Sequence, residues 1–163
     1  LGNGFTIAAV GGKKEIMNKL APDGNVYQAS TFAGNPISVT AAINSIKTIN
    51  KIKNNLYAKL ERNCELLVDE IDDLATDSRI PHQINSIASI FQFFFSSKPV
   101  TDYKTSKKAD GKKFNKLFSN LLKNGVFIAP SQFESVFLSD AHTDADITKT
   151  LGAYGSSLKA VKH

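Results

Sequence analysis

Two polar side chains, Gln132 and Glu134, interrupt an apolar stretch and are the first candidates for chemistry. They lie within GVFIAPSQFESVFLSDAHTDAD (residues 125–146), between apolar runs at 126–129 and 136–139 that we expect to be short strands. An amide and a carboxylate between buried strands are costly unless each finds a partner. A bound ligand is one such partner, and Glu134 could then act as an acid, a base or the counterion of a cation. The alternative is a hairpin whose turn simply faces water.

A second candidate site is the hydroxyl pair Ser30 and Thr31, which lies directly upstream of Pro36 in the string YQASTFAGNP. Pro36 suits the first position of a helix, where its missing N–H donor is not needed. Hydroxyl groups and free N–H groups before a helix N-terminus suit a phosphate. No Lys or Arg stands beside the pair, so the charge for a phosphate would come from elsewhere. The alternative is helix capping alone, for which Asn35 or Ser38 would suffice.

The N-terminal residues Leu1-Gly2-Asn3-Gly4-Phe5 form a third segment of unusual composition. Its glycines permit either a tight turn or the close approach of a ligand or another chain. The sequence also opens without Met and inside this glycine motif. We therefore expect the chain to be a fragment of a longer polypeptide.

The composition is that of a folded protein of one domain, or one domain with an appendage. The chain has 163 residues, of which 42% are hydrophobic and 21% charged, so it can bury a core. The single cysteine, Cys64, excludes an internal disulfide and a cysteine metal cluster. Cys64 shares helical register with Leu60, Leu67 and Ile71, which predicts a buried apolar role.

The net charge of +5 does not by itself indicate a nucleic-acid partner. The lysines cluster most densely within residues 98–123, without aromatic interleaving of the kind that single-strand binding needs, and the only arginines are Arg62 and Arg79. That pattern predicts a solvated lysine face and no nucleic-acid site. The apolar stretches are too short to span a membrane and no signal segment opens the chain, so a cytoplasmic location is expected.

The histidines do not predict a metal site. His82, His142 and His163 are remote from one another in the sequence, and the carboxylates between residues 61 and 73 are spread over more than three helical turns. We therefore expect no bound metal. His142 is interpreted as a structural residue near the start of a helix.

The elements that must position these residues follow from periodicity. Residues 1–36 are predicted to be irregular, with a helical turn at 14–19. Apolar residues at helical spacing predict helices at 37–49 and 55–74, which could instead be one long helix kinked near residues 50–55. Residues 84–95 predict one strand, central in its sheet because both of its faces are apolar.

The C-terminal half is predicted to contain two further helices. A polar connector at residues 96–110 precedes a predicted helix at 111–124, which Gly125 ends with a left-handed residue. Thr143, with two aspartates in the first turn, predicts the start of the last helix. The expected fold class is α+β, with helices covering one face of a small, mainly antiparallel sheet.

Together these strings resemble the C-terminal part of the glutamate-1-semialdehyde 2,1-aminomutase family, which belongs to the class III (fold type I) pyridoxal-phosphate aminotransferases. The matching strings are GNGF and IAAVGGKKEIM within residues 2–17, interrupted at Thr6, YQASTFAGNP at 27–36 and GVFIAPSQFE with FLSDAHTDADI at 125–147. The middle string is shared widely among class III enzymes. The string APSQFE followed by AHT is more specific to the aminomutases.

The resemblance implies a homodimeric isomerase that uses pyridoxal phosphate to convert a small molecule, glutamate 1-semialdehyde, to 5-aminolevulinate for tetrapyrrole synthesis. It places Thr31, with Ser30 beside it, at the phosphate of the cofactor held by the partner subunit. It places the carboxylate of Glu134 near the amino groups of the substrate. The lysine that forms the Schiff base with the cofactor in this family would fall immediately upstream of Leu1. This chain alone is therefore expected to be inactive and not to bind the cofactor.

The resemblance also implies a division into domains. Residues 1–36 would be the tail end of the large cofactor domain, which is α/β in this family, 37–55 a linking helix, and 56–163 the small C-terminal α+β domain. Two other functions stay open at this point. The chain could belong to a different class III aminotransferase, or it could be a non-catalytic α+β interaction domain.

Overall fold

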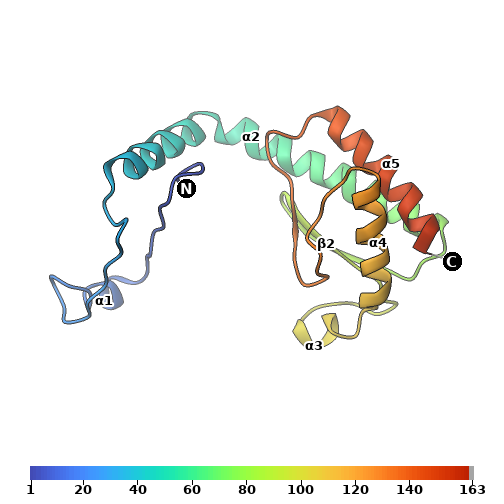
Figure 1. Ribbon diagram of the computed structural model, residues 1–163, viewed down its shortest axis with the longest axis horizontal. Helices are drawn as coiled ribbons and strands as arrows, with labels where there is room; N and C mark the ends of the chain where they lie inside the picture. The colour runs from blue at the N-terminus through green and yellow to red at the C-terminus, as the bar shows by residue number, and fades with distance from the viewer. Residues whose placement is uncertain (162–163) are drawn as a thin grey trace. The chain divides into compact units, whose positions relative to one another are not determined.

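The computed structural model describes residues 1–161, which divide into two compact units (Figure 1). The first unit is Leu1–Lys53 and the second begins at Asn54. The first contains α1 (Lys14–Met17), and α2 (Pro36–Asp77) belongs to both. The second unit contains the remaining elements, which are β1 (Gln83–Ile87), β2 (Ile90–Phe94), α3 (Tyr103–Ser106), α4 (Gly111–Lys123), β3 (Val136–Phe137) and α5 (Asp144–Val161). No helix within residues 1–161 is long and apolar enough to cross a membrane.

The glycine motif at the start of the first unit forms a tight turn. The Phe5 N–H donates to the Gly2 carbonyl over 3.1 Å. Asn3 and Gly4 both have positive φ, at 48° and 96°, a conformation that glycine and asparagine tolerate best. A side chain at position 2 would place its Cβ 2.5 Å from the Phe5 carbonyl oxygen, so this position requires glycine.

Helix α2 is a single continuous helix of 42 residues, which decides between the two alternatives that the sequence left open. After Pro36 it contains neither proline nor glycine, so no residue in it favours a break. Its N-terminus is capped by Asn35, whose Oδ1 accepts from the N–H groups of Ile37 and Ser38, each over 3.1 Å.

The sheet has three antiparallel strands in the order β1-β2-β3, so β2 is central as predicted. The prediction of one strand over residues 84–95 is wrong, because this segment folds as the β1–β2 hairpin. Ile87 pairs with Ile90, which leaves a two-residue turn in which Ala88 has a φ of 50°. The turn contains none of the residues that usually announce one, such as glycine, asparagine or aspartate.

Residues 126–129 are not a strand, and the second predicted strand is reduced to the two residues of β3. The Val126 N–H donates to the Leu121 carbonyl over 2.9 Å, so the start of this segment closes the end of α4 and does not join the sheet. Gly125 has a φ of 77°, which confirms it as the left-handed residue that ends α4.

The connector before α4 contains a short helix, α3, that the sequence analysis missed. Asp102 and Thr105 form a capping box, in which the Thr105 N–H donates to Asp102 Oδ1 over 2.7 Å and Thr105 Oγ1 accepts from the Asp102 N–H over 3.0 Å. Asp110 caps α4 by accepting from the N–H groups of Lys112 and Lys113.

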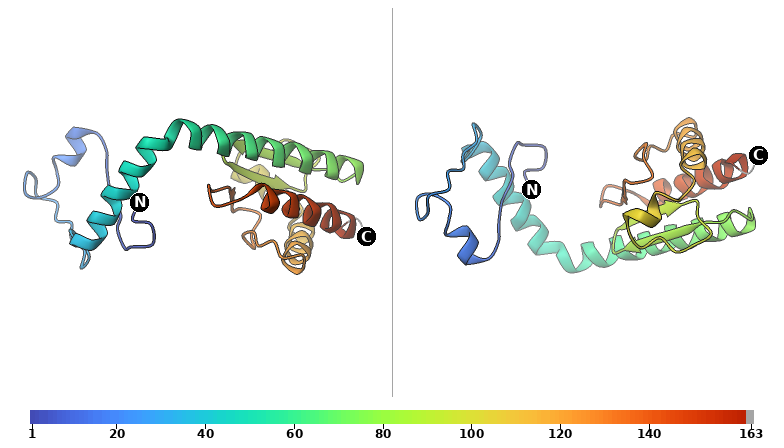
Figure 2. Two further views of the ribbon diagram at one scale, coloured as in Figure 1. Left: turned by 90° about the horizontal axis from the view of Figure 1, so that it is seen from above. Right: turned by 90° about the horizontal axis from the view of Figure 1, so that it is seen from below.

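The main core of the second unit lies between one face of the sheet and the helices α2, α4 and α5, which gather beside the hairpin in Figures 1 and 2. Phe91, Phe93 and Phe95 supply the sheet side of this core. The helices supply a larger set: Leu60, Cys64, Leu67, Ile71, Phe114, Leu117, Leu121, Ile147, Tyr154, Leu158 and Val161. Phe94, on the opposite face of β2, packs separately with Val100 and Ala109. The α+β prediction with helices on one face of the sheet is confirmed, as is the burial of Cys64.

The start of α5 depends on an aspartate, which makes the stability of this helix sensitive to acid. Asp146 Oδ2 accepts from the Thr143 hydroxyl over 2.7 Å and from the Thr143 N–H over 2.9 Å, and these bonds lower the pKa of the Asp146 carboxyl. A carboxyl with a lowered pKa in the folded state stabilises above its unfolded pKa, and the contribution disappears as the pH falls through the folded value.

We therefore expect Asp146→Asn to lower the thermal unfolding midpoint at pH 7, and the difference from the unsubstituted chain to shrink as the pH falls below about 4. Circular dichroism melts at a series of pH values measure this. A difference of equal size at pH 7 and at about pH 2 would show that the charge of Asp146 is not what stabilises the cap.

A buried hydroxyl on α5 offers a stabilising substitution. Ser157 is fully buried, and its Oγ has no hydrogen-bond partner among the described residues. Because an unpaired buried hydroxyl has lost its hydration without compensation, we expect Ser157→Ala to raise the free energy of unfolding by about 1 kcal/mol. Ser156→Ala is the matched control, since Ser156 Oγ already donates within α5 and is exposed. Urea unfolding of the two variants tests this, and equal effects would contradict it.

Candidate functional site

The polar turn that contains Glu134 is compact and leaves this carboxylate free. The Glu134 N–H donates to the Ser131 carbonyl over 3.1 Å, and the Phe133 N–H donates to Ser131 Oγ over 3.2 Å. Glu134 is exposed, and its side chain has no hydrogen bond or ion pair with any other residue that the structure describes. Of the two alternatives that the sequence left open, the structure shows the turn that faces water, because β3 begins only after the turn and no described residue covers the Glu134 side chain.

The buried polar group of the turn is the amide of Gln132. Gln132 is only 9% exposed, and its Nε2 donates to the Ser106 carbonyl at the end of α3 over 3.3 Å. Its main-chain carbonyl accepts from the side-chain amide of Gln92, on β2. Its Oε1 has no partner among residues 1–161. The turn is thus attached to the sheet and to α3 through Gln132, while Glu134 faces outward.

The hydroxyl pair lies in an exposed turn before α2. The Ser30 carbonyl accepts from the Ala33 N–H over 3.0 Å, and Ser30 Oγ accepts a long hydrogen bond of 3.4 Å from the Phe32 N–H, so Ser30 stabilises the turn. The Thr31 hydroxyl makes no hydrogen bond within the described chain. Since Asn35 is the residue that caps α2, neither hydroxyl is needed for that purpose, and Thr31 remains available as a donor.

The two candidate groups belong to different units. Ser30 and Thr31 lie in the first unit, and Glu134 lies in the second. The structure describes the local geometry of each group within its own unit.

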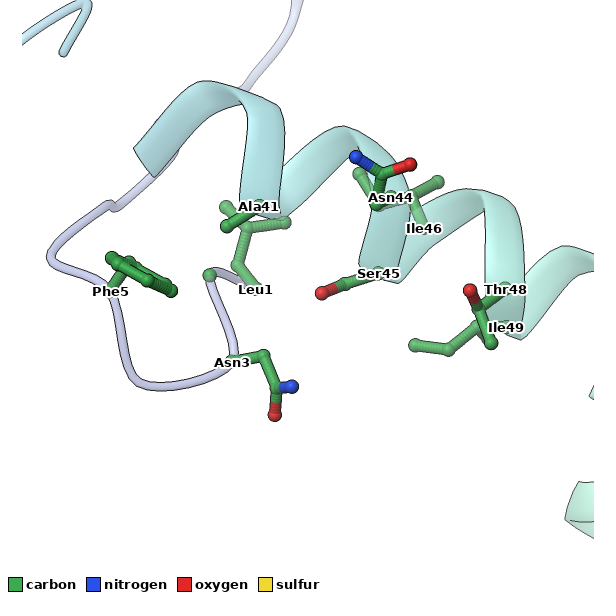
Figure 3. A pocket seen from close by; sticks show the side chains of 10 residues that line it. Leu1, Asn3, Phe5, Ala41, Asn44, Ser45, Ile46, Thr48 and Ile49 are labelled. Atoms are coloured by element: carbon green, nitrogen blue, oxygen red, sulfur yellow. The ribbon is translucent and has the colours of Figure 1, made fainter. Parts of the chain in front are cut away.

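The first unit also contains a hollow of about 570 Å³ between its N-terminal turn and α2 (Figure 3). Leu1, Phe5 and Ile49 make it largely apolar, and Asn3 and Ser45 are among its few polar side chains. None of the side chains that line it is titratable.

The histidines have structural contacts. His142 Nδ1 accepts from the Ser139 N–H over 3.0 Å just before α5, as expected of a structural residue. His82 lies between the Ile80 carbonyl and the Asp72 carboxylate, at 2.8 and 2.9 Å. Within residues 1–161 no three His, Cys, Asp or Glu side chains are grouped as metal ligands, and His163 lies outside the described residues.

The sequence analysis missed the residues that attach the Glu134 turn. Gln92 was not identified as a candidate, and the contact between Phe133 and Tyr103, with ring centroids 5.7 Å apart, was not expected. The signal that could have indicated Gln92 is its position among phenylalanines, because an amide in such a strand requires a polar partner.

Comparison with known proteins identifies a family over nearly the whole chain. The family model described as "Aminotransferase class-III" matches residues 1–153. The chain is 69% identical over 163 residues to a glutamate-1-semialdehyde 2,1-aminomutase of Nitrosopumilus maritimus, covering 100% of this chain and 38% of that protein. It is 56% identical to glutamate-1-semialdehyde 2,1-aminomutase 1 of Cenarchaeum symbiosum, covering 99% of this chain and 38% of that protein. The chain thus spans less than two fifths of the length of these relatives.

Solved structures show the same fold at low sequence identity. An omega-transaminase from Sphaerobacter thermophilus superposes with a TM-score of 0.81 at 19% identity, covering 99% of this chain and 37% of that one. A transaminase with pyridoxal phosphate (PLP) bound superposes with a TM-score of 0.75 at 18% identity, covering 92% of this chain and 34% of that one. At these identities the likeness concerns the fold alone.

Proposed function

We propose a function for this chain from the premise that it belongs to the class III aminotransferase family. The proposal is that it forms part of a longer pyridoxal-phosphate-dependent aminomutase, an isomerase that converts glutamate 1-semialdehyde to 5-aminolevulinate for tetrapyrrole synthesis. The observation that carries it is the 69% identity, along the whole chain, to the Nitrosopumilus maritimus protein of that name. Because the chain spans 38% of that relative, the activity is proposed for the longer protein, and this chain alone is expected to be inactive.

The proposed substrate and product are isomers. The amino group leaves the carbon next to the aldehyde, and the former aldehyde carbon carries an amino group in the product. No external amino donor or acceptor is consumed over a complete cycle. Pyridoxal phosphate, when bound, would supply the electron sink that makes the carbon–hydrogen bond beside the nitrogen acidic. The residues of this chain would help to bind the cofactor and to orient the substrate beside it.

Thr31 is proposed to donate a hydrogen bond to the cofactor phosphate of the partner subunit, with Ser30 shaping the turn. Its hydroxyl is exposed and is not engaged elsewhere in the described chain. It lies five residues before Pro36, the first residue of α2, and the N-terminal end of a helix favours an anion. These donors fit a phosphate, and the balancing positive charge would come from outside this turn.

Glu134 is proposed to face the cationic amino groups of the substrate. Its carboxylate lies in a defined turn and has no ion-pair partner among the described residues, so it remains available for such a group. A carboxylate near an amine favours the protonated amine, which is the physical basis of the proposed role.

A homodimer is proposed for the longer protein. The part of α2 that belongs to the first unit exposes Ile37, Ile43, Ile46, Ile49 and Ile52, each by 40% or more. An apolar surface of this kind is typical of one that another chain or domain covers. We also propose the domain division at residues 1–36, 37–55 and 56–163, and a cytoplasmic location, both of which remain predictions from the sequence.

The role of Thr31 predicts weaker cofactor retention on substitution. The test uses a chimera in which this chain replaces the matching segment of the Nitrosopumilus maritimus relative. Since one hydrogen bond to a charged group contributes about 1.5–3 kcal/mol, Thr31→Ala should weaken pyridoxal phosphate binding by about tenfold or more. Cofactor absorbance after dialysis measures this. Thr40→Ala, on the exposed surface of α2, is the control and should retain the cofactor. Equal cofactor retention by both variants would show that Thr31 does not bind the phosphate.

The alternative enzyme is a class III aminotransferase that exchanges its amino group with an external acceptor. The test is the turnover of glutamate 1-semialdehyde by the chimera without any added amino donor or acceptor. Sustained formation of 5-aminolevulinate supports the aminomutase. Product that appears only when a second amino compound is added supports the aminotransferase, and the absence of both activities supports a non-catalytic domain.

A further inference from the structure

The face of the sheet opposite the main core contains two neighbouring amides that each attach a connecting segment. Asn85 on β1 and Gln92 on β2 are directly opposite in the antiparallel register, so their side chains share one face. Asn85 Nδ2 donates to the Val100 carbonyl over 2.7 Å, in the connector before α3. Gln92 Nε2 donates to the Gln132 carbonyl, in the turn that contains Glu134.

Among residues 1–161 the Glu134 turn has three attachments, and Gln92 supplies the one that comes from the sheet. The second is the bond from Gln132 Nε2 to the Ser106 carbonyl. The third is the packing of the Phe133 ring against Tyr103 on α3. All three act on the two residues that immediately precede Glu134. The β2–β3 ladder pairs only Ile90 and Phe91 and therefore does not reach the turn.

We propose that Gln92 is a positioning residue that fixes the place of the Glu134 carboxylate. The inference rests on the proposed role of Glu134. Because the Glu134 side chain has no partner of its own in the described chain, its location is set by the main chain of the turn. The turn lies between the irregular residues 126–130 and a strand of two residues, so neither flank holds it in regular structure. The bond from Gln92 joins it to the central strand, whose other face is the core.

The expected consequence is kinetic. A displacement of about 1 Å in a group that faces the reacting atoms can cost up to about 100-fold in rate. Loss of one of three attachments should displace the turn less than complete release. We therefore expect an intermediate loss, of about tenfold, when the Gln92 hydrogen bond is removed.

The test is a double-mutant cycle in the chimera described above. Gln92→Met keeps the length of the side chain and removes its hydrogen bond, and it is measured alone and together with Glu134→Gln. We expect Gln92→Met to lower kcat/KM by about tenfold in the presence of Glu134, and by less than about twofold when residue 134 is already glutamine. Such non-additivity follows if Gln92 acts through Glu134, and a purely structural role would not produce it.

Asn85→Leu is the matched control. It removes the same kind of bond from the same face of the sheet, but the bond attaches Val100, so kcat/KM should change by less than about twofold. Thermal melts of all variants report on folding. If Gln92→Met does not accumulate as folded protein, Gln92→Asn replaces it, because it stays polar but is too short to reach Gln132.

The outcomes separate this inference from the proposed function. It is overturned if Gln92→Met is as active as Asn85→Leu, or if its full loss persists in the Glu134→Gln background. A Glu134→Gln variant with unchanged kcat/KM would overturn the inference together with the role of Glu134. The turnover of the unsubstituted chimera without an acceptor tests the aminomutase assignment independently of both residues.

Discussion

Replacing Glu134 with glutamine is expected to lower the turnover number of the chimera by about 100-fold, within the range that general acid–base and electrostatic groups contribute to catalysis. Glutamine preserves the shape of the side chain and removes its charge. Because Glu134 is exposed and unpaired among the described residues, the substitution should leave the thermal unfolding midpoint unchanged. Steady-state kinetics with glutamate 1-semialdehyde, together with a melt, measure both effects.

The control for this prediction is Glu61→Gln, which removes an exposed carboxylate from α2. It should change neither activity nor stability. A loss of less than about twofold for Glu134→Gln, equal to that of the control, would show that the carboxylate does not face the reacting groups.

Truncating Leu117 is expected to have the largest effect on stability. Leu117 lies on α4 and is completely buried in the core between the sheet and the helices. Leu117→Ala removes apolar contacts and leaves a cavity, so the free energy of unfolding should fall by about 3 kcal/mol. Urea unfolding of the chain, followed by circular dichroism, measures the change.

Leu122→Ala is the matched control on the same helix, because Leu122 is 49% exposed. It should cost less than about 1 kcal/mol, since little transfer energy is lost and no closed cavity forms. Equal losses for the two variants would contradict the placement of Leu117 at the centre of the core.

Periodicity and local chemistry predicted most of the helical structure. The stripe that includes Leu60, Cys64 and Leu67 indicated a buried helix face, and the structure confirms it. Gly125 and Thr143 marked the end of one helix and the start of the next, because both act within their own turn. Local signals of this kind depend only on residues three or four positions apart, and a sequence displays them directly.

The sheet was predicted less well, because its pairing depends on contacts that are distant in the sequence. The turn at Ala88 and Ser89 has no glycine or asparagine, so a hairpin resembled a single strand. The aromatic residues on both faces of β2 also made residues 84–95 resemble one continuous buried strand. Helix α3 had a recognisable signal in the capping pair Asp102 and Thr105, which the sequence analysis overlooked.

The candidate site shows the same limit. The sequence placed Gln132 and Glu134 in one turn, but which of them is buried depends on α3 and β2, whose residues lie far away in the chain. Gln132 is buried because it is hydrogen-bonded to both Ser106 and Gln92. Glu134 is exposed because β3 begins only after it. Tertiary contacts therefore decided the orientation of the turn.

The measurement that tests the central claim most directly is the fate of the amino nitrogen in the chimera. ¹⁵N-labelled glutamate 1-semialdehyde is supplied in excess over enzyme, together with a larger excess of unlabelled alanine, and the 5-aminolevulinate formed is analysed by mass spectrometry. An aminomutase returns the substrate's nitrogen to the product, so beyond the first turnover the label should be fully retained. Product that carries mainly unlabelled nitrogen would contradict the account, because the chain would then belong to an aminotransferase that uses an external donor.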